Sequence, residues 1–260
     1  MSIKFDEAFL LAMHQYRQAA HVQTRVQRYL DLLHPRPGQH VLDLGCGSGD
    51  FCRVLAERVA PNGHVTGVDP SPDAINLATH LAAAHDPALL TFEAGDGHHL
   101  PYADATFDAA ACISVLAFCA EPLRVLTELR RVLRAGGRLL VASADEDTRF
   151  YNGRDRVLGR RILRAIADRG HDPWTGRRLA AWLRSAGFTI VEELVLAQVE
   201  HDFNPSAGGY ILAYALHDYL LEHGISPWEY ERWLADLQAC AAEGAYSYGV
   251  TTFVYVVESD

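Results

Sequence analysis

The feature that most constrains this chain is a run of alternating glycines directly after a short apolar segment. Residues 40–51 spell HVLDLGCGSGDF, with glycines at positions 45, 47 and 49. The apolar segment predicts a buried strand, and the helical pattern that starts at about Asp50 predicts a helix after the loop. A strand, a loop with few side chains and a helix N-terminus, in that order, let a ligand lie against bare backbone. The stretch therefore predicts a pocket for a nucleotide-type cofactor.

The spacing of the glycines separates two classes of cofactor. The dinucleotide fingerprint G-x-G-x-x-G requires a third glycine where this chain has Asp50, and a carboxylate there is expected to repel a pyrophosphate. Asp69 ends the next expected strand and can accept hydrogen bonds from both ribose hydroxyls, while Asp43 adds a second carboxylate before the loop. These residues favour an adenosine that carries an amino acid and a sulfonium over NAD. A nicotinamide-dependent oxidoreductase remains the less favoured alternative.

Four stretches of the chain form a recognisable set: VLDLGCGSGDF, GVDPSPDAI, EAGDGHHLPYADATFDAAACISVL and LRRVLRAGGRLLVAS. As a set they resemble the successive motifs of class I S-adenosylmethionine (SAM)-dependent methyltransferases, in particular the small-molecule group similar to ubiquinone/menaquinone methyltransferases. The resemblance is dense over residues 38–145 and looser from Asp172 onward. It implies SAM as the cofactor and S-adenosylhomocysteine as its product.

The expected cofactor-binding residues come partly from their chemistry and partly from this resemblance. Gly45 and Gly47 leave room for the methionine portion, Asp43 suits its ammonium group, and Asp69 suits the ribose hydroxyls. The resemblance implies four further contacts. They are Asp96 with the adenine amino group, the Gly97 backbone with the ring edge, Pro70 with the ring face, and Ser114 at the position whose carbonyl receives the ammonium.

Strand and helix patterns alternate through the middle of the chain. We expect strands at 40–44, 64–69, 90–94, 108–114 and 138–143, and helices at 49–60, 72–84 and 121–134. Such alternation predicts an α/β fold with a doubly wound, mostly parallel, seven-stranded sheet of the Rossmann-like methyltransferase type, with the ligand at the carboxyl ends of the strands. One methyltransferase domain, 1–260, is expected to comprise an N-terminal helical cap (1–37), a SAM-binding core (38–145) and a region of substrate-cap helices and final strands (146–260).

The region after residue 145 is less regular in sequence. Residues 145–175 are expected to be irregular apart from an arginine-rich helix, and Thr175 is expected to cap a helix that ends near Ser185. The remaining expected elements are a strand at 189–197, helices at 206–222 and 227–242, and a β-branched final strand at 250–259.

The net charge of −10 makes nucleic acid a poor default partner. The charge is uneven, however: residues 149–187 hold 10 basic and 3 acidic groups, and residues 188–260 hold 1 and 12. Two interpretations remain open for this asymmetry. The arginines either pair with acids inside the cap or form an anion site.

The five cysteines show no framework spacing, which is typical of a reduced, cytoplasmic protein. The first residues, MSIKFDEAF, show no secretion signal, and the longest apolar run, 109–120, is shorter than the roughly 20 residues of a spanning helix. We therefore expect no membrane span, and a monomer or homodimer. No metal is expected, because adjacent His98 and His99 lack a helical ligand spacing.

Methyl transfer requires mainly that donor and acceptor are held in line. A general base is therefore the part of the site that the sequence indicates least clearly. His14 and His201 are the best candidates, since both lie on elements expected to border the cofactor opening. Tyr16, Phe118, Arg149 and Trp174 are candidates for contact with the acceptor, and an arginine there favours an anionic one.

The sequence thus favours a SAM-dependent methyltransferase that acts on O or N of a small, ring-containing acceptor. An alternative keeps SAM but uses its positive charge in a cyclisation or elimination without methyl transfer. A binding or scaffold module is disfavoured, because a scaffold does not need so many special backbone positions. Arsenite methylation is disfavoured too, since Cys112 and Cys119 alone do not form a cluster of thiols.

Overall fold

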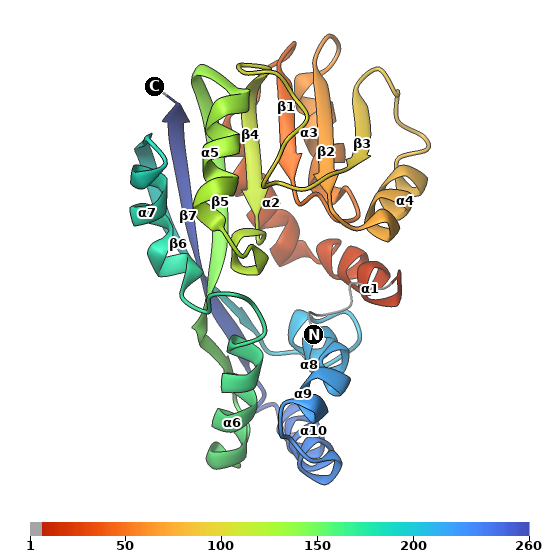
Figure 1. Cartoon of the computed structure of the whole chain (residues 1–260). Coiled ribbons are helices and arrows are strands. Elements are labelled where there is room, and N and C mark those ends of the chain that lie inside the picture. Colours follow the sequence, from red (N-terminus) through yellow and green to blue (C-terminus); the bar gives the residue numbers. More distant parts are fainter. Residues whose placement is uncertain (1–6, 260) are drawn as a thin grey trace.

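The computed structural model describes residues 7–259, which form one seven-stranded sheet with helices on both faces (Figure 1). The strand order is β3-β2-β1-β4-β5-β7-β6, and only β7 runs antiparallel to its neighbours. The predicted doubly wound, mostly parallel fold is confirmed. The strands are β1 (His40–Leu44), β2 (His64–Asp69), β3 (Leu90–Ala94), β4 (Phe107–Ile113), β5 (Leu133–Tyr151), β6 (Phe188–Glu200) and β7 (Tyr248–Ser259).

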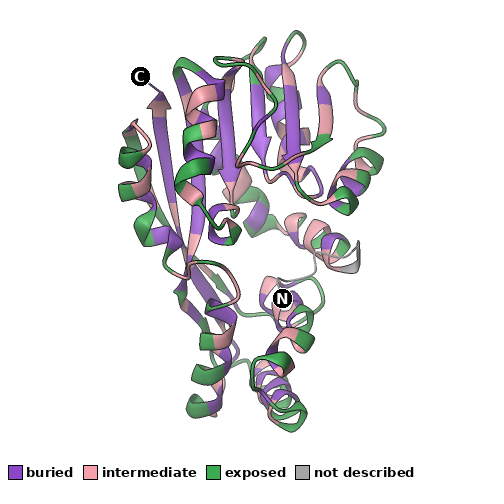
Figure 2. Ribbon diagram, in the orientation of Figure 1, coloured by how far each residue is buried: buried purple, intermediate pink, exposed green. Residues whose placement is uncertain are grey.

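Two apolar layers enclose the sheet, because alternate residues of each central strand face opposite sides. Leu42 on β1 packs in the layer that contains α5 and α7, whereas Val41 packs in the layer that contains α2 and α3. Figure 2 shows the central strands mostly buried, with their ends partly exposed. The helices are α1 (Glu7–Arg17), α2 (Ala20–Leu33), α3 (Asp50–Val59), α4 (Pro72–Leu81), the 3₁₀ turn η1 (Leu116–Phe118), α5 (Pro122–Val132), α6 (Arg156–Ala167), α7 (Thr175–Ser185), α8 (Gly208–Ala215), α9 (His217–Glu222) and α10 (Pro227–Ala242).

Most helix starts follow the local signals in the sequence. Ser71 caps α4 by accepting a hydrogen bond from the Ala74 amide, and α10 begins with a full capping box at Ser226. The expectation for α7 was wrong in detail. Trp174 is its N-cap, and Thr175 is the first helical residue, whose hydroxyl donates to the Asp172 carbonyl at 2.7 Å.

The strand expected at 138–143 is much longer, and the expectation of an irregular chain after 145 was wrong up to residue 151. β5 continues to Tyr151 because β7 pairs with it beyond the core, down to the pair Tyr151–Tyr248. The ladder shifts register between Asp145 and Phe150. Such a bulge re-aims the side chains it contains, so residues 146–149 leave the regular pattern.

The extended ends of β5, β6 and β7 carry a second helical body below the core (Figure 1). Its own apolar cluster joins α6, α8, α9 and α10 to Tyr151 and Tyr248. The helix expected at 206–222 is divided here into α8 and α9, since Leu216 ends the first and caps the second. α1 lies between this cap and the core, at the carboxyl ends of the parallel strands.

Within residues 7–259, the longest apolar helical stretches fall short of what a membrane-spanning helix requires. The expectation about a secretion signal concerns in part residues 1–6, which lie outside the described residues.

Candidate cofactor and acceptor site

The loop at residues 45–49, called the glycine loop below, has the backbone that its composition predicts. Gly45, Gly47 and Gly49 all have positive φ, at 75°, 54° and 71°. A Cβ on Gly45 would overlap the Val115 side chain, and a Cβ on Gly49 would lie 2.6 Å from the Phe92 ring. Side chains are therefore excluded twice, by the left-handed backbone and by close packing. The loop presents bare backbone at the carboxyl ends of the strands.

Three carboxylates, those of Asp43, Asp69 and Asp96, lie at or just after the carboxyl ends of β1, β2 and β3, and each is held differently. Asp69 accepts from the Gly47 amide at 3.0 Å and from the Ser71 amide at 2.9 Å. Asp96 is largely exposed, and hydrogen bonds from the His98 amide and ring lower its pKa. His98 therefore orients Asp96, a role that its position in the sequence did not indicate.

Asp43 is the buried member of the three, with 3% of its surface exposed. The Cys52 thiol donates to its Oδ2 at 3.0 Å. Burial raises the pKa of Asp43 to about 6, against the opposing effects of the Cys52 hydrogen bond and the positive charge of Arg17. A ligand that brings a positive charge would favour the ionised form of this carboxyl group.

The expected contacts beyond β4 have a distinctive backbone. Ser114 has φ of 61°, uncommon for a residue with a side chain, and its amide donates to the Ala142 carbonyl at 2.8 Å. Such backbone strain is retained where surrounding contacts enforce it, often at functional sites.

The two residues that the resemblance places beside the adenine ring, Gly97 and Pro70, follow β3 and β2. Gly97 lies so close to Leu44 that a Cβ would come within 3.0 Å of it, and Pro70 is exposed beside Asp69.

α1 covers the glycine loop through a polar network centred on Asp50. His14 Nδ1 lies 2.6 Å from Asp50 Oδ1, and Arg17 donates to Ser48 at 2.8 Å and to Asp50 at 3.1 Å. Arg53 adds a second arginine at 2.6 Å. Although burial acts in the opposite direction, Arg17, Ser48 and these neighbours lower the pKa of Asp50. The expected repulsion of a pyrophosphate by Asp50 is therefore weakened, because its charge is already balanced.

The Asp50 network also defines what His14 can do. Because an ionised carboxylate only accepts, Nδ1 carries the proton, and the neutral ring then has its free lone pair on Nε2. This is the arrangement in which an acid orients a histidine as a base. The Arg17 guanidinium lies 3.6 Å from where a Gly47 Cβ would be, directly over the loop. Sequence analysis missed Arg17, since a single arginine on an amphipathic helix carries no motif.

Tyr16 and His201 do not border the glycine loop as expected. The Tyr16 side chain is buried, and its hydroxyl donates to Glu200 at 3.0 Å at the end of β6. Glu200 also accepts from the Gly209 amide at 3.0 Å, so Tyr16 ties α1 to the cap. His201 is exposed, and its ring Nδ1 lies 3.3 Å from the Tyr246 carbonyl oxygen. This contact does not direct His201 toward the glycine loop.

Arg149 belongs to a buried group of charges that we call the ion cluster, which consists of Glu146, Arg149 and Arg169. The Phe118 ring contacts this cluster. Glu146 accepts from Arg149 at 2.8 and 2.9 Å and from Arg169 at 2.7 and 3.1 Å. Arg169 lies 5.9 Å from the centre of the Phe118 ring, and Arg149 also donates to the Tyr248 hydroxyl. Burial opposes ionisation, but the two arginines lower the pKa of Glu146 to about 2.

Arg149 and Trp174 come together in one cavity of about 470 Å³ between the β5 bulge and α6, called the α6 cavity below. Trp174 donates to Asp147, and Arg177 and Arg178 each lie 5.2 Å from its ring centre. Two of the residues that the sequence suggests for contact with the acceptor thus line the same cavity. Phe118 and Tyr16 are not part of that lining.

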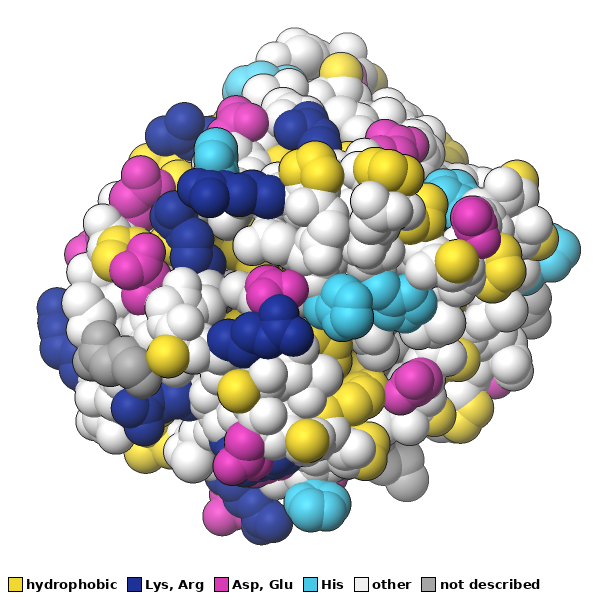
Figure 3. All heavy atoms as spheres, turned by 90° about the horizontal axis from the view of Figure 1, so that it is seen from above, with side chains coloured by type: hydrophobic (Ala, Val, Ile, Leu, Met, Phe, Trp, Pro, Cys, Tyr) yellow, Lys and Arg dark blue, Asp and Glu magenta, His cyan; other side chains and the backbone are white. Residues whose placement is uncertain are grey.

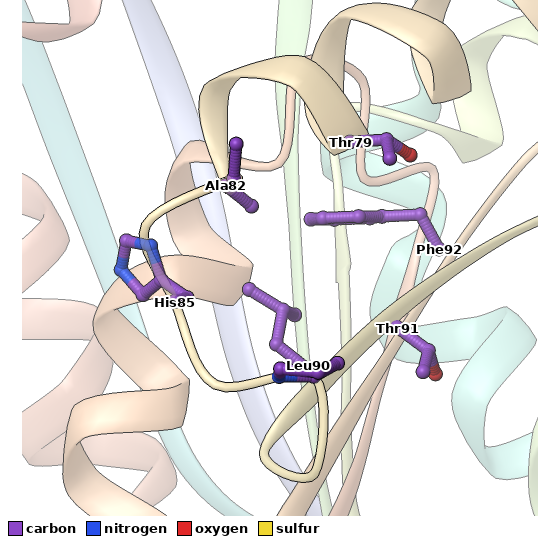
Figure 4. Close-up of a pocket in the computed structure, with 8 residues that line it drawn as sticks. Thr79, Ala82, His85, Leu90, Thr91 and Phe92 are labelled. Carbon is purple, nitrogen blue, oxygen red and sulfur yellow. The ribbon is translucent and has the colours of Figure 1, made fainter.

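A second cavity, of about 340 Å³, lies between the end of α4 and β3. Figure 4 shows Phe92 and Leu90 pointing into it from β3, with His85 at its margin. The Phe92 ring contacts the positions of Gly49 and Gly67, so it supports the glycine loop from behind.

Among residues 7–259, no group of three or more His, Cys, Asp and Glu side chains has the arrangement of a metal site. The five cysteines are all free thiols, and burial strongly raises the pKa of Cys112.

Comparison with known proteins locates the chain among methyltransferases. A family model described as a methyltransferase domain matches residues 35–184. The chain is 35% identical over 136 residues to a demethylmenaquinone methyltransferase of Symbiobacterium thermophilum, covering 52% of this chain and 54% of that protein. It is 38% identical over 114 residues to an arsenite methyltransferase of Halobacterium salinarum, covering 44% of this chain and 29% of that protein. The chain spans about half the length of these curated relatives, or less.

Solved structures share the fold over nearly the whole chain. The 4+2 cyclase SpnF is 22% identical with a TM-score of 0.61, over 93% of this chain and 83% of that one. A SAM-dependent methyltransferase from Aquifex aeolicus is 16% identical with a TM-score of 0.58, over 96% of this chain and 99% of that one. At such identities the likeness concerns the fold alone.

Proposed function

The chain belongs to the methyltransferase domain family, and from that premise we propose that it transfers a methyl group from SAM to an oxygen or nitrogen of a small, ring-containing metabolite. The observation that carries the proposal is the glycine loop, with three glycines of positive φ, together with carboxylates near the carboxyl ends of β1, β2 and β3. The partly exposed Phe118 ring, on the turn after β4, supports an acceptor with a ring.

The residues present fit this cofactor. Its hydroxyl, amino and ammonium groups are donors, and Asp69, Asp96 and Asp43 are acceptors spaced along one edge of the sheet. Arg17, directly over Gly47, suits the carboxylate of the methionine portion, because guanidinium and carboxylate can pair through two hydrogen bonds. Pro70, Gly97 and Ser114 keep their proposed roles beside the adenine ring and the ammonium.

SAM, when bound, supplies a methyl group on a positively charged sulfur that a nucleophile can displace. The protein then has to exclude water, orient the acceptor and remove a proton if the acceptor is a hydroxyl. His14 is suited to the last task, since Asp50 holds its Nδ1 and leaves Nε2 as the basic nitrogen. No carboxylate of residues 7–259 pairs with His201, which therefore ranks behind His14.

Calorimetric titration tests the cofactor. SAM and S-adenosylhomocysteine are expected to bind with micromolar affinity, and NAD is expected not to bind. Release of S-adenosylhomocysteine in the presence of hydroxylated and aminated aromatic acceptors then tests methyl transfer. Tight NAD binding without SAM binding would refute the proposal, and turnover of an acceptor without release of the product would favour the cyclisation alternative.

The role of His14 is tested with a matched pair of histidine variants. For a hydroxyl acceptor, His14→Gln is expected to lower kcat by roughly 10²–10⁴-fold, the usual contribution of a general base. His201→Gln is expected to leave kcat unchanged. Both variants should bind S-adenosylhomocysteine within a few-fold of the parent protein. Equal losses in the two variants would contradict the assignment.

A further inference from the structure

The ten arginines of residues 149–187 divide into two groups in the structure. Six of them have a carboxylate partner within 3 Å: Arg149, Arg154, Arg161, Arg169, Arg177 and Arg178. Two of those pairs, Arg154–Glu243 and Arg161–Glu229, reach the acidic C-terminal region. Pairing inside the cap thus accounts for part of the positive charge of this segment, and among the described residues the other four arginines make at most one weak ion pair.

The remaining arginines lie mainly on α6. Within residues 7–259, the side chains of Arg156 and Arg160 have no hydrogen bond or ion pair, and Arg164 reaches Asp168 only at 4.0 Å. Arg160 and Arg164 are one helical turn apart, so they share a face of α6. Both line the α6 cavity, whereas Arg156 does not.

The inner wall of the same cavity is formed in part by Glu146 and Arg149 of the ion cluster, in which one carboxylate serves two guanidinium groups. The second of these guanidinium groups belongs to Arg169, which does not line the cavity. The arginines of the lining are Arg149, Arg160 and Arg164, and its acids are Glu146, Asp147 and Asp168.

The three acids of the lining differ in their partners. Glu146 accepts from two arginines, whereas Asp147 accepts from the neutral Trp174 N–H, and Asp168 reaches Arg164 only at 4.0 Å. Leu163, Ala167 and Pro173 supply apolar wall beside these charges. Arg160 and Arg164, which have no close carboxylate partner in the described part of the chain, suit together with this wall a ligand with an anionic group and an apolar body.

The wall of the cavity is also connected to the loop that faces the cofactor. The His171 amide donates to the Ala117 carbonyl at 2.8 Å, and a Cβ on Gly170 would come within 2.6 Å of the same carbonyl. Arg169 covers the Phe118 ring. The segment 169–171 thus packs directly against the turn after β4 on one side and joins the ion cluster on the other.

We propose that the α6 cavity binds the anionic end, a phosphate or carboxylate, of the acceptor whose other end reaches the turn after β4. The proposal rests on the proposed methyltransferase function and names the class of its acceptor. Figure 3 shows a different surface, the face at the amino ends of the parallel strands, on which acidic and basic side chains are interspersed.

Phenyl phosphate is the probe, since it joins a phosphate to a small apolar ring. Calorimetric titration of the full chain is expected to show one site, with benzyl alcohol, the neutral control, not binding. The double variant R160Q/R164Q should weaken phenyl phosphate binding at least tenfold, whereas the matched variant R156Q, from the same helix but outside the cavity, should change it less than twofold. An equal loss in R156Q, or no loss in the double variant, would overturn the site.

Two further measurements separate this proposal from the function on which it rests. S-adenosylhomocysteine should bind R160Q/R164Q as tightly as the parent protein, which also shows that the variant is folded. If SAM does not bind at all, the proposed function fails whether or not phenyl phosphate binds. In the methyl-transfer assay, phenyl phosphate should compete with the acceptor and raise its apparent KM without changing kcat. Binding that leaves the acceptor KM unchanged would show a separate anion site and overturn the assignment to the acceptor.

Discussion

The two sides of the site are built by different means. On the core side, the glycine loop, Asp43 and Asp69 come from two consecutive strand-to-helix connections, and short-range backbone contacts hold them. On the cap side, the ion cluster and the Tyr16–Glu200 contact join segments far apart in the chain, and buried charges hold them. The core side is therefore a local motif, whereas the cap side depends on tertiary contacts.

This contrast shows where the chain is tolerant and where it is vulnerable. The core side depends on small residues and positive φ, so an added side chain should damage it. The cap side depends on compensated charges, so loss of a single carboxylate should damage it. The following predictions test the contrast.

The largest effect is expected from Glu146→Gln. It leaves Arg149 and Arg169 buried without their common carboxylate, and breaking a buried ion pair costs about 3–5 kcal/mol of stability. Chemical denaturation at pH 7 should show this loss. Glu243→Gln, which removes the exposed partner of Arg154, should show no measurable loss. Similar behaviour of the two variants would refute a special role for the ion cluster.

Gly45→Ala is expected to weaken S-adenosylhomocysteine binding by at least a hundredfold, or about 2.7 kcal/mol. The new Cβ would overlap Val115 and would also occupy a left-handed backbone position at φ 75°. Gly38→Ala is the matched control, because Gly38 has φ of 85° but no atom within 4 Å of its Cβ position. It should lose stability by about 1–2 kcal/mol and retain cofactor binding.

Asp43→Asn is expected to stabilise the ligand-free protein at pH 8 while weakening cofactor binding. The pKa of Asp43 is raised from 3.8 to about 6, so its neutral form stabilises the fold below pH about 4, and this contribution is lost as pH rises to 6. At about 1.4 kcal/mol per unit, the gain at pH 8 is at most about 3 kcal/mol. Denaturation at pH 4 should show no gain, and a gain equal at both pH values would contradict the role of burial.

Tyr16→Phe is expected to have the smallest effect, about 1 kcal/mol of stability, because it removes the hydroxyl that donates to Glu200 and accepts from Gln198 between α1 and β6. Hydrogen exchange should report faster opening of α1, with the central strands unchanged. If α1 exchanges as slowly as in the parent protein, the other contacts of α1 suffice to hold it.

The same contrast explains which parts of the fold could be predicted. Strands β1, β2 and β3 have the predicted bounds, since each is a short apolar run that ends at a turn signal. The length of β5 was missed, because its last residues are mostly polar and form a strand only through pairing with β7, which lies far along the chain, as in the pair Tyr151–Tyr248. The family, the fold class and SAM as cofactor are confirmed. The residue roles and the cytoplasmic location remain predictions.

The candidate site divides in the same way. Asp69 and the three glycines could be identified because a strand end and a glycine-rich turn define positions without reference to the rest of the chain. Arg17, Glu146, Arg169 and Glu200 could not, since their partners lie on other elements. His14 was identified, but its orientation by Asp50 required the fold.

The sequence by itself determined the class of cofactor, because backbone torsion and the absence of side chains in the glycine loop are local properties of the residues. Tertiary structure alone decided which arginines are neutralised and which remain available at the α6 cavity. The physical reason is that a charge has no preferred partner along the chain: its energy depends on burial and on the groups that folding brings within a few ångströms.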